Sequence, residues 1–213
     1  MYLSLQSETV TEKVIEKSRF LTFTSHVEGE EEAKAFLARV REQHPLATHV
    51  CYGLIADKTG NIQRFSDDGE PQGTAGLPIL GVVKAQKLFE SAVAVVRYFG
   101  GVKLGAGGLT RAYASCAAEG IAASTVCEYD GCEEIEITVN YPEADALVRF
   151  LEGENASVLN RAFGERAVFT VAVRERDRER FISALQNRLL GKALLKEGKK
   201  YFYPFPHGAN ERG

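Results

Sequence analysis

The sequence has no long apolar run, no leader-like N-terminus and little net charge. Its 213 residues include 26 Lys and Arg against 29 Asp and Glu, for a net charge of −3. No apolar run approaches the length of a membrane span, and the opening MYLSLQSETV has neither a basic segment nor an apolar one. We therefore expect a cytoplasmic protein with no membrane partner. Because the net charge is slightly negative, a polyanion such as a nucleic acid would have to bind at a local basic patch.

Motifs built on cysteine, histidine or serine are also missing. The four cysteines form no C-x-x-C pair and have no histidine at metal-ligand spacing, which favours free thiols in a reducing compartment. Neither H-E-x-x-H nor G-x-S-x-G occurs, and no serine has the sequence context of a nucleophile. The sequence therefore predicts no catalytic residue and no cofactor.

The first part of the chain alternates helical and strand-like segments. Apolar residues at helical spacing predict helices near 30–40 and 108–123. Residues 49–56 and 62–65 flank a polar turn and predict a hairpin, while residues 92–99 are apolar almost throughout and predict a central strand. In the second helix Arg111 lies away from the apolar stripe, where it is free to meet solvent or a ligand.

The pattern changes after residue 133. A strand at 135–139, a helix started by Pro142, strands at 157–162 and 167–173, a helix near 181–189 and a strand at 201–205 follow in order. This βαββαβ order is that of a ferredoxin-like unit. We therefore expect an α+β protein with two domains, residues 1–130 and 131–213.

One stretch, RYFGGVKLGAGGLTRAY at 97–113, combines five glycines and three cations with no carboxylate. It is not a Walker A loop, because Ala106 follows Gly105, and it matches a dinucleotide fingerprint only in part, because Thr110 replaces the last glycine. The stretch could be a phosphate cradle before a helix, or only a tight crossover with solvated cations. The candidate anion- or nucleic-acid-binding residues are Arg97, Gly100, Gly101, Lys103, Gly105, Gly107, Gly108 and Arg111.

A second stretch, FSDDGEPQGTA at 65–75, places three carboxylates within four residues. Asp67, Asp68 and Glu70 could hold a divalent metal, or they could cap the next helix and pair with Arg97 or Arg111. We favour the structural interpretation, with no metal, because metal sites usually draw ligands from more than one segment. The candidate residues of this loop are Ser66, Asp67, Asp68, Gly69, Glu70, Pro71, Gly73 and Thr74.

Together, FSDDGEPQGTAGLPIL (65–80) and VVRYFGGVKLGAGGLTRAY (95–113) resemble the signature of the IMPACT family, uncharacterised protein family 0029. The likeness runs from about Lys17 to Ala123, and residues 133–205 resemble the ferredoxin-like domain that follows in bacterial members. One departure is Leu77, where many members carry a basic residue. The resemblance implies a first domain like the second domain of ribosomal protein S5, and a second like a C-terminal domain of elongation factor G.

Both likenesses point toward RNA or the ribosome, and eukaryotic relatives regulate translation under stress. We therefore expect a non-enzymatic RNA- or ribosome-associated protein involved in the regulation of translation, in which Arg97, Lys103 and Arg111 contact phosphates. One alternative is an enzyme that acts on a phosphorylated small molecule, with Mg²⁺ at Asp67, Asp68 and Glu70. Another is a module that docks a protein partner.

Overall fold

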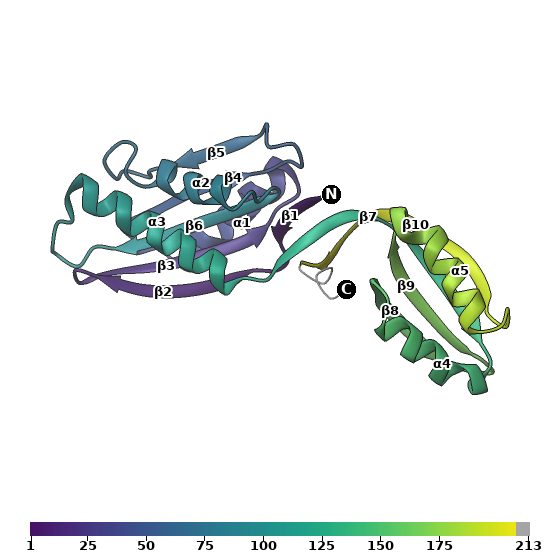
Figure 1. The fold of residues 1–213 in the computed structure, drawn as a ribbon. Helices are drawn as coiled ribbons and strands as arrows, with labels where there is room; N and C mark the ends of the chain where they lie inside the picture. Colours follow the sequence, from purple (N-terminus) through teal and green to yellow (C-terminus); the bar gives the residue numbers. More distant parts are fainter. Residues whose placement is uncertain (208–213) are drawn as a thin grey trace. The chain divides into compact units, whose positions relative to one another are not determined.

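The computed structural model describes residues 1–207, and the chain divides into two compact α+β units, shown in Figure 1. The N-terminal unit is Tyr2–Cys127, and the C-terminal unit comprises Met1 and the residues from Glu128 onward. The fold class is the one that the sequence predicts. The predicted boundary, between residues 130 and 131, lies three residues further along the chain.

The N-terminal unit is built on an antiparallel sheet with the strand order β2-β3-β6-β4-β5. Its strands are β2 (Thr9–Ile15), β3 (Ser18–His26), β6 (Ser91–Tyr98), β4 (His49–Ile55) and β5 (Gln63–Ser66), and the short β1 (Tyr2–Leu5) precedes them. Strand β6 lies at the centre, as predicted, because its apolar residues are buried on both faces of the sheet. Strands β4 and β5 form the predicted hairpin.

Helices cover both faces of this sheet and make three layers (Figure 1). Helix α1 (Gly29–Gln43) packs Ala33, Phe36 and Val40 against one face. Helices α2 (Gly76–Ala85) and α3 (Gly105–Ala123) cover the other face, with Ile79 and Tyr113 fully buried. Both sequence motifs therefore lie at the α2 and α3 side of the sheet.

Helix α3 begins at Gly105, earlier than the predicted start near residue 108. Glycine disfavours a helix interior, and the apolar stripe begins only at Leu109, so sequence periodicity alone left Gly105 and Gly107 outside the predicted helix. In the structure they form the first turn, and Gly105 enters the helix with a φ of 69°. The buried and exposed faces of α3 are those that the sequence predicts, since Leu109 is buried and Arg111 is exposed.

The C-terminal unit has the ferredoxin-like βαββαβ order, with β7, β9 and β8 as successive neighbours and β10 also paired with β7; the sheet order is β1-β7-β9-β8, so the long β7 pairs with β1 as well. Its core consists of apolar residues of β7, β9 and the two helices, including Ile137, Phe169 and Phe181. Strands β7 and β10 extend well beyond the predicted 135–139 and 201–205. The elements are β7 (Val126–Val139), α4 (Tyr141–Glu152), β8 (Ala156–Phe163), β9 (Ala167–Arg174), a 3₁₀ turn (Glu175–Asp177), α5 (Arg178–Arg188) and β10 (Leu194–Pro206).

Candidate functional site

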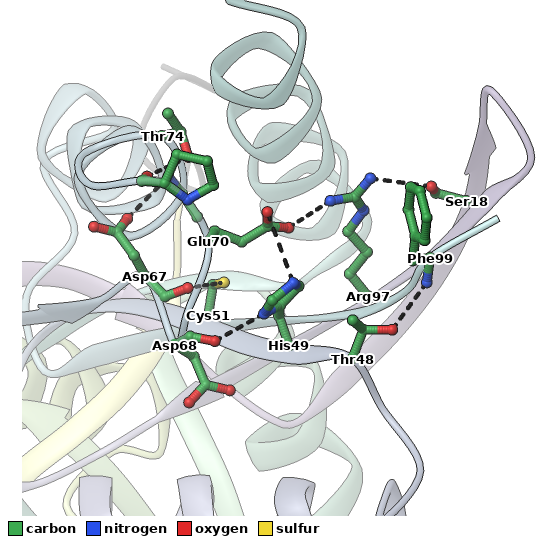
Figure 2. Close-up of polar contacts among 12 residues, drawn as sticks. Ser18, Thr48, His49, Cys51, Asp67, Asp68, Glu70, Thr74, Arg97 and Phe99 are labelled. Atoms are coloured by element: carbon green, nitrogen blue, oxygen red, sulfur yellow. Dashed lines mark hydrogen bonds and ion pairs between the residues drawn. The ribbon is translucent and has the colours of Figure 1, made fainter. Parts of the chain in front are cut away.

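Asp67 caps the start of helix α2 from the preceding loop (Figure 2). Its Oδ2 accepts a hydrogen bond from the Gly73 N–H at 2.8 Å, and its Oδ1 accepts from Ala75 at 3.0 Å and Gly76 at 2.8 Å. Burial alone would raise the pKa of Asp67, but these three N–H donors outweigh it and hold the pKa below its usual value. Asp67 thus serves the orphan N–H groups that Ala75, the N-cap residue, cannot satisfy.

Asp68 ties the same loop to α1 and β4. Its carboxylate accepts hydrogen bonds from Arg41 Nη2 at 2.9 Å and from the Val50 N–H at 2.7 Å, and its carbonyl oxygen lies 2.8 Å from His49 Nδ1. Burial acts to raise the pKa of Asp68, and Arg41 and Val50 together lower it below the usual range. Asp68 therefore fastens the loop to α1 and β4.

Glu70 joins the two sequence motifs in a buried ion pair (Figure 2). Arg97 Nη1 donates to Glu70 Oε1 at 2.6 Å, and the Tyr113 hydroxyl donates to the same oxygen at 2.7 Å. The Arg97 and Glu70 side chains are only 5% and 4% exposed. Arg97 Nη2 also donates to Ser18 Oγ at 3.2 Å, and His49 Nε2 lies 3.8 Å from Glu70 Oε2.

The remaining residues of the acidic loop support its own turn. The Ser66 hydroxyl oxygen accepts from the Asp68 N–H at 3.1 Å, and the Thr74 hydroxyl donates to the Pro71 carbonyl at 2.6 Å. Gly69 and Gly73 have φ values of 87° and 75°, which favour glycine. The loop is therefore held by contacts within the fold.

These contacts leave no shared metal site at Asp67, Asp68 and Glu70. The three carboxylates face different protein partners, and they do not come together as a ligand set among the residues described. Asp67 caps a helix, and Asp68 and Glu70 pair with arginines.

The predicted set of three phosphate-binding cations also needs correction. Arg97 lies on the central strand, where its side chain turns into the layer beneath α2 and α3 and is neutralised by Glu70. Lys103 and Arg111, by contrast, are exposed, and neither has a hydrogen-bond or ion-pair partner in the part of the chain that the structure describes. The candidate cations are therefore these two.

Lys103 and Arg111 line one surface groove of about 590 Å³ in the N-terminal unit. The groove adjoins the first turn of α3, which contains no acidic residue and whose N-cap, Leu104, makes no side-chain capping bond. A helix start of this kind is electrostatically positive. The titratable residues that line the groove are Lys13, Glu16, Lys103 and Arg111, and Lys13 is paired with Glu119.

Several glycines of this region are required by the backbone itself. A Cβ on Gly100 would lie 1.9 Å from the Lys17 carbonyl oxygen, in the turn between β2 and β3. Gly101 has a φ of 86° and Gly105 a φ of 69°, so both occupy left-handed conformations. These three glycines fit the crossover interpretation, while Gly107 meets only Arg111 Nη1, 3.5 Å from the position of a Cβ.

The sequence analysis did not single out Phe99, a residue that is 46% exposed and directly precedes Gly100. It lines a second pocket, of about 410 Å³, together with His49, Arg97 and Lys103. The Arg97 guanidinium lies 5.3 Å from the centroid of the Phe99 ring, and the Phe99 N–H donates to Thr48 Oγ1 at 3.0 Å. The signal was present in the motif RYFGG, where an aromatic residue directly precedes two glycines and stands close to cations.

In the described part of the chain, no helix is both long enough and apolar enough to cross a membrane. The four cysteines are free and buried. Burial raises the pKa of the Cys51 thiol to about 12 and that of Cys116 to about 11. These thiols are therefore protonated at neutral pH and are poor nucleophiles.

The fold places this chain among two-unit α+β proteins in which a layered N-terminal unit is followed by a ferredoxin-like unit. The Impact N-terminal domain matches residues 16–121, and the Domain of unknown function DUF1949 matches residues 137–192. The chain belongs to the IMPACT family.

Similar proteins include the IMPACT family member YvyE of Bacillus subtilis, 35% identical over 93% of this chain and 91% of the relative. An IMPACT family member of Thermus thermophilus is 45% identical over 67% of this chain and 79% of its own length. A solved crystal structure of a hypothetical protein is 31% identical, with a TM-score of 0.60 over 91% of this chain and 95% of the other.

Proposed function

We propose that this chain is a cytosolic, non-enzymatic RNA- or ribosome-associated protein that takes part in the regulation of translation under stress. The observation that carries the proposal is the groove at the start of α3, where Lys103 and Arg111 are exposed and have no partner among the described residues. An exposed cation without a carboxylate partner is available to a phosphate.

The groove offers three kinds of contact to a nucleic-acid backbone. Lys103 supplies a point charge, and Arg111 supplies a planar fork that fits phosphate oxygens in a bidentate manner. The N–H groups of the first turn of α3 add neutral donors at the positive end of a helix dipole. Glu16 also lines the groove and would repel a phosphate. The nucleic-acid backbone should therefore lie along the α3 side of the groove.

The exposed ring of Phe99 adds a surface on which an unpaired base can stack. Base stacking on aromatic side chains is typical of proteins that bind single strands, and it tolerates different sequences. Lys103 lines both the groove and the Phe99 pocket, so one strand could place a phosphate on Lys103 and a neighbouring base on Phe99. We therefore propose single-stranded RNA, free or exposed on a ribosome, as the partner.

Co-sedimentation with ribosomes and with RNA tests this proposal. The variant Lys103→Ala/Arg111→Ala should lose binding at moderate salt while the wild type retains it. A matched control, Lys84→Ala/Arg149→Ala, removes the same two charges from exposed helical positions whose side chains also have no partner in the described structure. Equal binding by both double variants would overturn the site assignment.

The two other functions predict different outcomes, one in the co-sedimentation assay and one in a thermal melt. A protein-docking module would bring down its partner after nuclease treatment, and the double variant would bind RNA as the wild type does. An enzyme for a phosphorylated small molecule would be stabilised by that ligand in a thermal melt. With Asp67, Asp68 and Glu70 engaged by protein groups, such an enzyme would have to bind its ligand without a metal at that loop.

A further inference from the structure

Three potential metal ligands from separate segments meet at one edge of the N-terminal unit. His26 ends β3, Glu28 is the N-cap residue of α1, and Glu90 directly precedes β6. The antiparallel register, with His26 opposite Ser91, brings these segments together, and the Val27 N–H donates to the Glu90 carbonyl at 2.8 Å. One ligand atom from each of the three side chains lies within 4.8 Å of the others.

That spacing is close to what a bound ion requires. Two ligand atoms that each lie about 2.1 Å from a metal ion are at most about 4.2 Å apart. The ligand atoms here lie within 4.8 Å of one another, so a shift of a few tenths of an ångström would bring all three to coordination distance. Glu28 is able to make that shift, because its side chain is 62% exposed. His26 is held as the last residue of β3, and Glu90 is held by hydrogen bonds from the Val27 N–H and the Tyr2 hydroxyl.

Hydrogen bonds orient the ring of His26. The Ser4 hydroxyl donates its hydrogen to the Glu90 carbonyl at 3.0 Å, so its oxygen accepts from His26 Nδ1 at 2.7 Å. This arrangement indicates the tautomer with the hydrogen on Nδ1. In this tautomer Nε2, which lies 3.5 Å from Glu28 Oε1, carries the lone pair that a metal ion needs.

Glu90 supplies an independent indication of a cation. It is only 5% exposed, and its Oε2 accepts a hydrogen bond from the Tyr2 hydroxyl. Its carboxylate forms no ion pair with a lysine or an arginine in the part of the chain that the structure describes. A buried carboxylate without a compensating charge is costly, and a metal ion at the cluster would supply that charge.

We propose that His26, Glu28 and Glu90 bind a divalent transition-metal ion, through the His26 Nε2 and one carboxylate oxygen from each glutamate. One imidazole and two carboxylates suit Zn²⁺ or Mn²⁺ better than Mg²⁺ or Ca²⁺, which prefer oxygen ligands alone. With three protein ligands, water completes the coordination. The ion would fasten the start of α1 to the ends of β3 and β6. This site is separate from the α3 groove and does not depend on the proposed RNA binding.

Titration of the full, reduced chain with Zn²⁺ and Co²⁺ tests the site. Calorimetry should give one equivalent of bound Zn²⁺. Glu28→Gln should weaken this binding by at least about 10-fold, since even outer-shell changes cost that much. Glu42→Gln, at an exposed position near the other end of α1, is the matched control and should leave the affinity unchanged.

Glu28→Gln is the preferred variant because the exposed Glu28 side chain makes no capping hydrogen bond that the fold requires. Glu90→Gln provides a second test, since the amide oxygen still accepts from Tyr2, and circular dichroism checks that it folds. Absence of saturable binding by the wild type, or retention of wild-type affinity by either variant, would overturn the proposal. A thiolate-to-cobalt charge-transfer band would assign the metal to cysteine instead and would also overturn it.

Discussion

Arg97 and Glu70 form an ion pair of 2.6 Å inside the N-terminal unit, and each side chain is almost fully buried. One residue comes from the glycine-containing motif and the other from the acidic loop, so the two stretches that stand out in the sequence are halves of one structural contact. Phe20 and Phe99 lie near the guanidinium, at 5.5 and 5.3 Å from their ring centroids. The Arg97 guanidinium therefore stabilises the fold and does not line the α3 groove.

Removing one partner of this pair should be strongly destabilising. Arg97→Met is expected to lower the free energy of unfolding by about 3–5 kcal/mol, because it leaves the Glu70 carboxylate buried without its counter-ion. The double variant Glu70→Gln/Arg97→Met should lose less than the sum of the two single variants, since it buries no lone charge. Urea unfolding measures both. A loss below about 1 kcal/mol for Arg97→Met would contradict the buried pair.

The cap at Asp67 predicts a specific dependence of stability on pH. Since the folded pKa of Asp67 is lowered, its contribution is fully present above the ordinary carboxyl pKa of about 3.9 and is lost as the pH falls through the folded value. Asp67→Asn should therefore destabilise the protein by about 1–3 kcal/mol at pH 7. The difference in unfolding free energy between Asp67→Asn and the wild type should be smaller near pH 3 than at pH 7.

Thermal or urea unfolding at the two pH values checks this prediction. Asp57→Asn is a useful comparison, because Asp57 also has a lowered pKa but accepts its backbone hydrogen bonds within the turn between β4 and β5 and caps no helix. If Asp67→Asn is destabilised as much at pH 3 as at pH 7, the negative charge of Asp67 does not contribute to the cap.

The glycines of the second motif should respond differently to alanine. Gly100→Ala places a Cβ 1.9 Å from the Lys17 carbonyl oxygen, so it should destabilise the unit severely or prevent folding. Gly107→Ala meets no backbone atom and lies in a helix, where alanine is favoured by about 0.5–1 kcal/mol. Gly107→Ala should therefore raise the melting temperature. Equal effects of the two changes would contradict the assigned roles.

The sequence predicted the elements well where one face of a helix or strand is buried. The stripe of Leu109, Ala112 and Tyr113 in α3 and the βαββαβ order of the C-terminal unit follow from local periodicity. The start of α3 was wrong because glycine has a low helix propensity, and the tertiary setting overrides it.

The site was harder to predict because it depends on the directions of single side chains. Strand β6 is buried on both faces, so its pattern of apolar residues does not reveal which way Arg97 points. The exposure of Arg111 was predicted, because α3 has a clear buried stripe. The cluster at His26, Glu28 and Glu90 left no local signal, since strand pairing between β3 and β6 brings its members together.

The most direct test of the account measures binding of a labelled single-stranded RNA by fluorescence anisotropy at several salt concentrations. We predict that Lys103→Ala/Arg111→Ala binds the RNA more weakly. A plot of the logarithm of its binding constant against the logarithm of salt concentration should be shallower than that of the wild type by about 1.4, since each single-strand phosphate contact contributes about 0.7 to the slope. Lys84→Ala/Arg149→Ala should retain the wild-type slope. An unchanged slope and affinity for Lys103→Ala/Arg111→Ala, or an equal loss in the control, would contradict the claim that the start of α3 binds RNA.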